Sequence, residues 1–369
     1  MRRSLSLSQV TALAMTLALL AALALLTGPA TAASVPTRAR AAGITSAGPA
    51  VTVPGSLTGV AAVSARDAWA VGDRQVGSTL RTLIEHWNGR TWRPAASPDP
   101  AGNDSLTSVT ATSQANAWAV GEHGTRTLIL HWNGQSWRQV PSPAGGNLAG
   151  VAATSARNAW AVGLAGRHMV LEHWNGRSWR QVRSPVAAGA LYGVAATSAS
   201  SAWAVGADNS GILVLHWNGR SWKRFPAPNP ANGAIYAVTA TSARNAWAVG
   251  TISPPNSFLS NVLIEHWNGR SWRRDPASQP PQCGCVLLGA GASSSRNAWA
   301  VGLDQNHLGF TDIVIERWQG RRWRPVPSPV QEGLLTGVAA LPAGPAWAVG
   351  SPDTLSTSLI LTWNGTAWR

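Results

Sequence analysis

The chain has 369 residues, of which 21 are tryptophan and 2 are cysteine, and its formal net charge at pH 7 is +14. Its length exceeds that of a usual single domain, but all the tryptophans belong to one pattern that occurs seven times, so length is a misleading guide to domain number. Short runs rich in Val, Thr, Trp and Ile, broken by Gly, Asn, Ser and Pro, nearly exclude helices from the repeated region.

Residues 1–32 are predicted to be a secretory signal peptide. Two arginines near the start precede an apolar run over 10–26, and a small-residue cleavage motif ends at Ala32. The mature protein is therefore expected to be secreted, extracellular or cell-wall associated, by the general or the twin-arginine route. An uncleaved anchor is the alternative, because the apolar run is near the lower limit for crossing a bilayer. Residues 33–50 show no apolar periodicity and are predicted to be a flexible leader.

From residue 51 to 369, each unit carries Ala-Trp-Ala-Val-Gly, then a Trp-Asn-Gly or Trp-Gln-Gly turn, then a third tryptophan. In the third unit the pattern predicts four strands, over 148–155, 159–163, 169–174 and 179–182. Repeats of roughly 40 to 50 residues are typical of propellers and solenoids. We therefore predict an all-β fold, a seven-bladed β-propeller of four-stranded antiparallel blades. The blades are predicted to start near residues 57, 106, 148, 191, 235, 287 and 335.

The two ends of the repeated region predict how the ring closes. The last unit stops at Trp368 and Arg369, without the Val-Pro tail that follows the third tryptophan in other units, whereas 51–54 supplies a similar Val-Thr-Val-Pro. The N-terminal segment is therefore predicted to complete the seventh blade and to leave no edge unpaired.

The turn between strands 3 and 4 is marked by Asn88-Gly89 and its copies. Asn-Gly favours a two-residue type I′ hairpin, because both central positions need positive φ. In that register Trp87 faces Arg90 and Glu85 faces Trp92, which predicts an indole packed against a guanidinium group.

Ala-Trp-Ala-Val-Gly, followed by Glu-His-Trp-Asn-Gly-Arg-Thr-Trp from Glu85 to Trp92, resembles kelch-type propellers, including the propeller of galactose oxidase-like proteins. The pattern is also similar to that of secreted tryptophan-repeat propellers of high-GC bacteria. It departs from kelch in having one glycine in place of a double glycine and His-Trp in place of a tyrosine. The Asn-Gly-x-x-Trp turn is similar to the end of the Asp-box of sialidase-like propellers, without its aspartate and serine. The resemblance implies the fold and no particular activity.

The units differ in length only between the first and second tryptophans and between the third tryptophan and the first tryptophan of the next unit. These stretches are the strand 2–3 loops and the blade-to-blade connections, which emerge on one side of a propeller. We name this side the loop face and expect recognition there, because variable loops on a rigid scaffold usually carry binding sites. The longest loops span 251–261 and 303–311. Candidate residues for binding sugar hydroxyls or a cation are Asp73, Glu122, His123, Asp208, Asp304 and His307.

The opposite side carries the 1–2 and 3–4 turns and much of the arginine, and we name it the turn face. Removal of the signal peptide leaves a formal charge of +12 (14 − 2), which the repeat distributes around the ring. A basic ring can hold polyanions. The alternative is that these arginines are solvated, stack on tryptophan and were copied with the repeat. The polyanion candidates are Arg90, Arg177, Arg220, Arg270 and Arg321.

Catalytic groups are not predicted. The innermost strands, where propeller enzymes usually place them, are expected to begin at the blade starts given above and to contain no acid, base or thiol. Tyr192 and Tyr236 are expected to pack near the mouth of the central channel. Five histidines recur one blade apart, so they cannot jointly ligate a metal and are expected to pack. They are His86, His131, His173, His216 and His266.

Cys283 and Cys285 are predicted to form a local disulfide that staples the connection between blades five and six. Two thiolates alone rarely complete a zinc site, so neither a metal nor a cofactor is predicted.

These patterns favour an exported, non-catalytic binding protein, monomeric and without a transmembrane span in the mature chain. Its expected partner is a glycan, a cell-envelope polymer or a protein, held on the loop face. A carbohydrate-active enzyme, either a glycoside hydrolase or a lyase, and a polyanion binder that uses the turn face are the alternatives.

Overall fold

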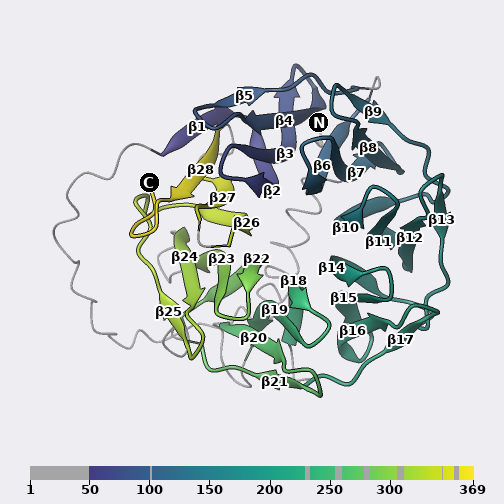
Figure 1. The fold of residues 1–369 in the computed structure, drawn as a ribbon, viewed down its shortest axis with the longest axis vertical. Coiled ribbons are helices and arrows are strands. Elements are labelled where there is room, and N and C mark those ends of the chain that lie inside the picture. The colour runs from purple at the N-terminus through teal and green to yellow at the C-terminus, as the bar shows by residue number, and fades with distance from the viewer. Residues whose placement is uncertain are drawn as a thin grey trace, which may run out of the picture. The chain divides into compact units, whose positions relative to one another are not determined.

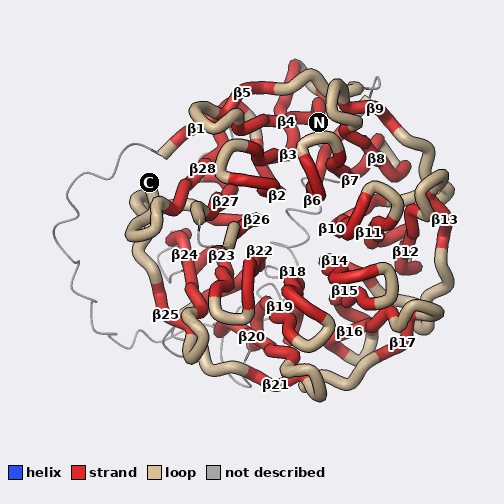
Figure 2. Tube along the Cα trace, in the orientation of Figure 1, coloured by secondary structure: helices blue, strands red, loops and turns tan. Residues whose placement is uncertain are grey.

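The computed structural model describes residues 50–99, 102–228, 233–253, 260–277, 283–305, 311–342, 344–352 and 357–369. The predicted signal peptide, the predicted leader up to residue 49 and the candidate His307 lie outside this part of the chain. Within it, the regular structure consists of 28 strands in seven four-stranded sheets, arranged around a centre as blades (Figure 1). Figure 2 shows strands joined by turns and loops, with no helix among the described residues. The predicted seven-bladed β-propeller is confirmed.

The strands of each blade follow one another from the centre of the ring to the rim (Figure 1). Blade 1 comprises β2 (Ser56–Ser64), β3 (Asp67–Val76), β4 (Thr79–Trp87) and β5 (Trp92–Pro94). Blade 2 comprises β6 (Asp104–Ser113), β7 (Asn116–His123), β8 (Arg126–Trp132) and β9 (Trp137–Gln139). Blade 3 comprises β10 (Asn147–Ser155), β11 (Asn158–Ala165), β12 (His168–Trp174) and β13 (Trp179–Gln181).

The remaining blades keep the same order. Blade 4 comprises β14 (Ala190–Ser198), β15 (Ser201–Asp208), β16 (Gly211–Trp217) and β17 (Trp222–Arg224). Blade 5 comprises β18 (Gly233–Ser242), β19 (Asn245–Ile252), β20 (Asn261–Trp267) and β21 (Trp272–Arg274). Blade 6 comprises β22 (Cys285–Ser294), β23 (Asn297–Gln305), β24 (Thr311–Trp318) and β25 (Trp323–Pro325). Blade 7 comprises β26 (Leu334–Ala340), β27 (Ala346–Ser351), β28 (Thr357–Trp363) and β1 (Val51–Pro54).

Blade 7 joins the two ends of the repeated region, as predicted. β1 pairs with β28 from Val51 opposite Ile360 to Pro54 opposite Thr357. The last residue, Arg369, exchanges two backbone hydrogen bonds with Thr362, further along the same strand. The outer edge of β28 is therefore covered end to end by two segments from opposite ends of the chain (Figure 1).

The core of the propeller lies between blades rather than within them. Each of its seven apolar clusters combines residues of two adjacent blades. In the first interface, Trp69 of blade 1 packs on Trp132 and edge-on against Trp137 of blade 2, with ring centroids 4.8 and 5.1 Å apart. Trp347 of blade 7 lies 6.4 Å from Trp87 of blade 1, so the same packing closes the ring. Because each indole buries a large apolar area, these contacts dominate blade-to-blade cohesion.

The five strand 3 histidines pack, as expected. Each lies against the strand 2 tryptophan of its own blade; His86, for example, stacks on Trp69 with ring centroids 4.1 Å apart. His131 Nε2 is also hydrogen-bonded to Asn116 Oδ1 at 2.9 Å. Burial lowers the pKa of His131, His173, His216 and His266, so these rings are neutral at pH 7.

The predicted register of the 3–4 turn is wrong. Trp87 pairs with Trp92, not with Arg90, and Glu85 lies opposite Pro94. The loop has four residues, because Asn88 Oδ1 accepts hydrogen bonds from the backbone N–H groups of Arg90 and Thr91. The indole-guanidinium contact occurs instead in blade 6, where the guanidinium carbon of Arg317 lies 4.8 Å from the ring centroid of Trp299.

Candidate ligand-binding site on the loop face

Among the described residues of the loop face, a blade-to-blade connection contacts the 2–3 loops of the two blades that it joins. Between blades 1 and 2, the Leu80 N–H donates to Asn103 Oδ1 at 3.0 Å, and the Gly124 N–H donates to the Asn103 carbonyl at 2.8 Å. The connection that carries Asn103 thus ties the 2–3 loops of two blades together.

The inner strand of blade 2 begins with a buried acid. Asp104 is fully buried, lies directly opposite His123 at the end of β7, and is hydrogen-bonded through Oδ1 to the His123 ring nitrogen Nδ1. Burial raises the pKa of Asp104, and the hydrogen bond with His123 acts in the opposite direction. Nearby Asp99 raises it further. Part of the Asp99 effect is a side-chain hydrogen bond between the two carboxyl groups.

Two further carboxyl groups lie beside this pair. Glu122 precedes His123 and is only 5% exposed; its Oε1 accepts from Ser105 Oγ at 3.5 Å, and its Oε2 has no partner. Burial raises its pKa to about 7, and the charge of Asp73 contributes to the rise. Asp73 occupies the same position in blade 1, after Gly72, and burial raises its pKa to about 6. The two carboxyl groups therefore interact across the junction of blades 1 and 2.

We name Asp73, Asp104, Glu122 and His123 the acidic cluster. Asp73 and His123 are partly exposed, and Glu122 and Asp104 lie buried. Near neutral pH the carboxyl groups of Asp73 and Glu122 occur in both protonation states, because their pKa values are about 6 and about 7, so the cluster offers hydrogen-bond donors as well as acceptors. No group of three or more His, Cys, Asp or Glu suited to a metal ion occurs in the described ranges.

The other loop-face candidates lie in other blades. Asp208 of blade 4 is paired with Arg224 Nη1 at 2.7 Å and accepts from Ser210. Burial alone would raise the pKa of Asp208, but these hydrogen bonds and the Arg224 charge hold it below its usual value. Asp304 of blade 6 lies directly opposite Cys285. The structure thus brings together Asp73, Glu122 and His123 and leaves Asp208 and Asp304 apart from them.

Asp104 was missed by the sequence analysis, which expected the inner strand to begin at Leu106 and to contain no acid. β6 instead begins at Asp104, beyond a register shift between Leu106 and Ser108. The pairing of β6 with β7 could have revealed Asp104. Ala111 lies opposite Ala117, and a register shift of one residue between Leu106 and Ser108 then places Asp104 opposite His123.

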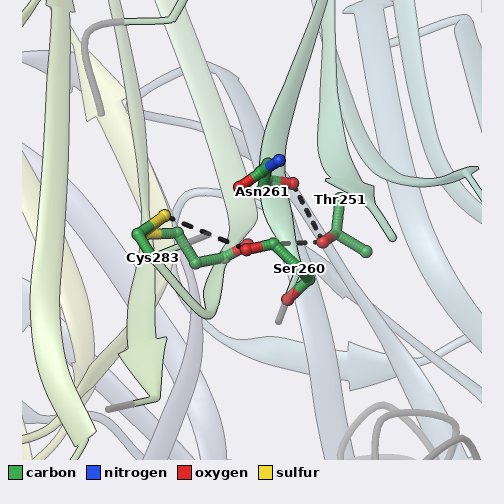
Figure 3. Close-up of a disulfide and its surroundings, with 5 residues drawn as sticks. Thr251, Ser260, Asn261 and Cys283 are labelled. Atoms are coloured by element: carbon green, nitrogen blue, oxygen red, sulfur yellow. Dashed lines mark hydrogen bonds between the residues drawn. A yellow bond between two sulfur atoms is a disulfide. The ribbon is translucent and has the colours of Figure 1, made fainter. Parts of the chain in front are cut away.

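The connection between blades 5 and 6 contains a disulfide between Cys283 and Cys285 (Figure 3). The N–H of Gly284, between them, donates to the Ser260 carbonyl at 2.9 Å, and Thr251 Oγ1 donates to the carbonyls of Asn261 and Cys285. Gly284 has a φ of 77°, which favours glycine. The short disulfide ring thus holds the connection against the 2–3 loop of blade 5.

Tyr192 and Tyr236 of neighbouring inner strands lie with ring centroids 5.8 Å apart. Burial raises the pKa of both, that of Tyr236 to about 12, so neither ring ionises near neutral pH. This agrees with packing beside the channel.

On the turn face, the five polyanion candidates Arg90, Arg177, Arg220, Arg270 and Arg321 are all exposed.

No protein-family model matches the chain, and no curated protein matches it. Among solved structures, YCF48 bound to D1 peptide is similar over 86% of this chain and 97% of its own, with a TM-score of 0.55 and 15% identity. Virginiamycin B lyase from Staphylococcus aureus is similar over 85% and 98%, with a TM-score of 0.59 and 12% identity. A GH74 enzyme from Niastella koreensis is similar over 85% of this chain and 54% of its own, with a TM-score of 0.54 and 13% identity.

At these identities the similarity shows the fold alone. The chain is thus a seven-bladed β-propeller with tryptophan-containing blades, and its structural neighbours include both enzymes and a peptide-bound protein. The kelch-type resemblance stays a prediction. In the ranges that the structure describes, no helix has the length and hydropathy needed to cross a membrane.

Proposed function

We propose that this chain is an exported, non-catalytic binding protein that holds its ligand on the loop face, at the acidic cluster. The observation that carries the proposal is the buried carboxyl oxygen Glu122 Oε2, which has no hydrogen-bond partner. An unpaired buried polar atom is costly, and a ligand that supplies a donor removes the cost.

A glycan fits this chemistry best, because its many hydroxyl groups both donate and accept hydrogen bonds. Carboxyl groups with pKa values of about 6 and 7 can take either role near neutral pH. A peptide is the second candidate ligand, supported by the peptide bound to the structural neighbour YCF48.

Glycan and peptide arrays followed by titration calorimetry would test the proposal. We expect Glu122→Gln and Asp73→Asn to weaken binding roughly tenfold or more, because each removes a carboxylate from the cluster. Asp208→Asn is the matched control: it lies on the same face but is paired with Arg224 in another blade, and it should bind like the wild type. Shortening the 251–261 loop tests a site elsewhere on the face. Unchanged affinity in both cluster variants would overturn the assignment of the site.

A carbohydrate-active enzyme is the second candidate function. Asp73 and Glu122 favour it, because carboxyl groups with pKa values near 6 and 7 suit proton transfer at neutral pH. A panel of polysaccharides assayed for new reducing ends and for unsaturated products separates the two functions. Cleavage that disappears in Glu122→Gln would establish the enzyme, and binding without cleavage would support the first proposal.

Export is part of the proposal and rests on the predicted signal peptide. Expression of the full chain in a bacterial host, with N-terminal sequencing of the protein recovered outside the cytoplasm, should give a chain that begins at Ala33. Retention of the full-length chain in the membrane fraction would favour the anchor instead.

A further inference from the structure

The turn face holds pairs of arginines that the sequence does not place together. In blade 1, Arg66 of the 1–2 turn packs its aliphatic stem over Gly89 of the 3–4 turn, where an added Cβ would lie 3.1 Å from Arg66 Cβ and Cγ. The residue after that glycine is Arg90, so two arginines converge at one corner of the blade. The same arrangement gives the pairs Arg157 with Arg177, Arg244 with Arg270, and Arg296 with Arg321.

The second tryptophan of each of these four units fixes this arrangement. Trp174 Nε1 donates to the Ala156 carbonyl at 3.0 Å, immediately before Arg157. Trp87, Trp267 and Trp318 make the same bond to the residue that precedes Arg66, Arg244 and Arg296. Each indole therefore clamps the 1–2 turn against the 3–4 hairpin, and the positions of the paired arginines are set by the rigid blade.

These pairs have no acidic partner. All eight arginines are exposed, and the ion pairs of arginine within the described ranges are Arg81 with Asp99 and Arg224 with Asp208. The one acid beside a 1–2 turn, Asp67, is buried and hydrogen-bonded to His86 at 2.6 Å. Like charges held side by side without compensation repel one another, and a negatively charged partner would remove that repulsion.

The positive charge follows an arc. Blades 3, 5 and 6 carry arginine pairs, and blade 4 between them carries Arg220, with Ser200 in the 1–2 turn. Blade 2 has Ala115 in the 1–2 turn and Gln135 in the 3–4 turn, at the positions of the paired arginines, so it interrupts the ring of positive charge. A further exposed basic residue follows the third tryptophan of every unit: Arg93, Arg138, Arg180, Lys223, Arg273, Arg324 and Arg369.

We propose that the arc over blades 3 to 6 binds a flexible, linear phosphodiester polymer of the cell envelope, of the glycerol-phosphate type. Guanidinium groups form paired hydrogen bonds with phosphate oxygens, and two of them at one corner match a doubly coordinated phosphate. A curved row of such corners requires a polymer that bends over the width of one protein, whereas duplex DNA is stiff over about 50 nm. The envelope source rests on the proposed export; the surface itself is separate from the acidic cluster.

Binding of the secreted protein to purified poly(glycerol phosphate), measured at several salt concentrations, tests this proposal. Affinity should fall linearly with salt on logarithmic axes. Replacing Arg157, Arg177, Arg244 and Arg270 by Gln should weaken binding at least about tenfold and reduce the salt slope, because phosphate contacts are lost. The matched control replaces Arg74, Arg126, Arg167 and Arg183, which are exposed on the loop-face side, by Gln and removes the same charge. It should retain most of the affinity.

Three outcomes would overturn the proposal: equal loss in both quadruple variants, wild-type binding by the turn-face variant, or tighter binding of duplex DNA than of poly(glycerol phosphate) at equal phosphate concentration. Thermal unfolding of each variant checks that the blades stay folded. Glycan binding measured on the turn-face variant reports separately on the acidic cluster, whose residues it leaves unchanged, so failure of one proposal is distinguishable from failure of the other.

Discussion

A buried glutamate recurs at one position of strand 3, and its surroundings differ between blades. In blade 3, Glu172 Oε1 accepts from Ser142 Oγ at 2.7 Å and from the Ala144 N–H at 3.0 Å. In blade 5, Glu265 is fully buried and neither carboxyl oxygen has a partner. The residue five after the third tryptophan of the preceding blade is Ser142 in the first case and Ala227 in the second. Blade 5 therefore lacks the side-chain hydroxyl that bonds to Glu172 in blade 3.

Restoring that hydroxyl should stabilise the protein. We expect Ala227→Ser to raise the free energy of unfolding by about 1 kcal/mol, because it gives Glu265 the hydrogen bond that Glu172 has. Urea denaturation measures the change. Ser142→Ala is the reciprocal control and should cost about 1–3 kcal/mol, since it leaves Glu172 without its side-chain donor. An unchanged midpoint in Ala227→Ser would contradict the explanation.

Glu265 also predicts how stability depends on pH. Burial raises its pKa to about 8 from an ordinary value of 4.5, although Arg274 acts to lower it. Between about pH 4.5 and 8 the folded protein holds a proton that the unfolded chain releases, so this residue makes stability fall as pH rises through that window. Glu265→Gln should make the fall shallower and equal or exceed the wild type in stability at pH 8.

Denaturant midpoints measured from pH 5 to 9 check this prediction. Asp208→Asn is a suitable control, because the pKa of Asp208 is lowered and its contribution is lost only as pH falls. A decline in the Glu265→Gln variant as steep as in the wild type would rule out Glu265 as its source.

At the scale of the element, the 3–4 turn shows that the Asn-Gly dipeptide does not determine the pairing register of the two strands that it joins. Asn-Gly serves a two-residue hairpin, but it serves equally well in a four-residue loop whose asparagine caps two backbone N–H groups. In blade 3, Asn175 Oδ1 accepts from Arg177 and Ser178, and Trp174 pairs with Trp179. The second and third tryptophans thus become cross-strand partners, with ring centroids 6.0 Å apart.

The 3–4 turn requires glycine because its backbone has a positive φ there. In some blades a neighbouring arginine side chain also leaves little room for a Cβ atom. Gly176 has a φ of 91°, and an added Cβ would lie 3.2 Å from Arg157; Gly365 has a φ of 105° and nothing within 4 Å of such a Cβ. Gly365→Ala should lower the free energy of unfolding by about 1 kcal/mol through backbone strain alone. Gly176→Ala should cost more, because the Arg157 stem must also move. Chemical denaturation of both variants measures the difference, and equal costs would show that the arginine contact is unimportant.

The sequence was sufficient for the blade count and the closure, because the tryptophans mark every unit and because 51–54 supplies the tail that the last unit lacks. It was insufficient for the acidic cluster. Asp104 and His123 lie beyond a register shift between Leu106 and Ser108, so a count along β6 and β7 without the shift does not place them opposite each other. The arginine pairs were equally hidden, since Arg66 and Arg90 belong to different turns, which are brought together by the contact of Arg66 with Gly89 and by the hydrogen bond of Trp87 to the Ala65 carbonyl.

At the scale of the whole molecule, hydrogen bonds between inner strands join blade 1 to blade 2, blade 2 to blade 3 and blade 7 to blade 1. Thr58 Oγ1 donates to the Leu106 carbonyl at 2.7 Å, and Thr336 Oγ1 of blade 7 donates to the Leu57 carbonyl of blade 1 at 3.2 Å. On the outside, β1 alone covers most of the edge of β28. The ring is therefore closed at both its inner and its outer circumference.

Removing β1 tests how much the outer closure contributes. A chain shortened to begin at Ser56 should lose roughly 2–5 kcal/mol of unfolding free energy, because β28 loses its backbone partners along β1 and the packing of Val53. It should also self-associate through the uncovered edge. A chain that begins at Pro49 keeps β1 and should match the full chain. Denaturation and light scattering give both measurements, and equal stability of the two shortened chains would contradict this role for β1.

The shared outer strand of blade 7 also dictates the order of events during biosynthesis. Ser358 Oγ donates to the Gly55 carbonyl across a separation of 303 residues, so β1 leaves the ribosome long before its partner is translated. Until β28 is synthesised, β1 has no partner strand. It is only four residues long and ends in proline, which has no backbone N–H to donate to a strand of another molecule. The ring therefore cannot close before β28 has been synthesised.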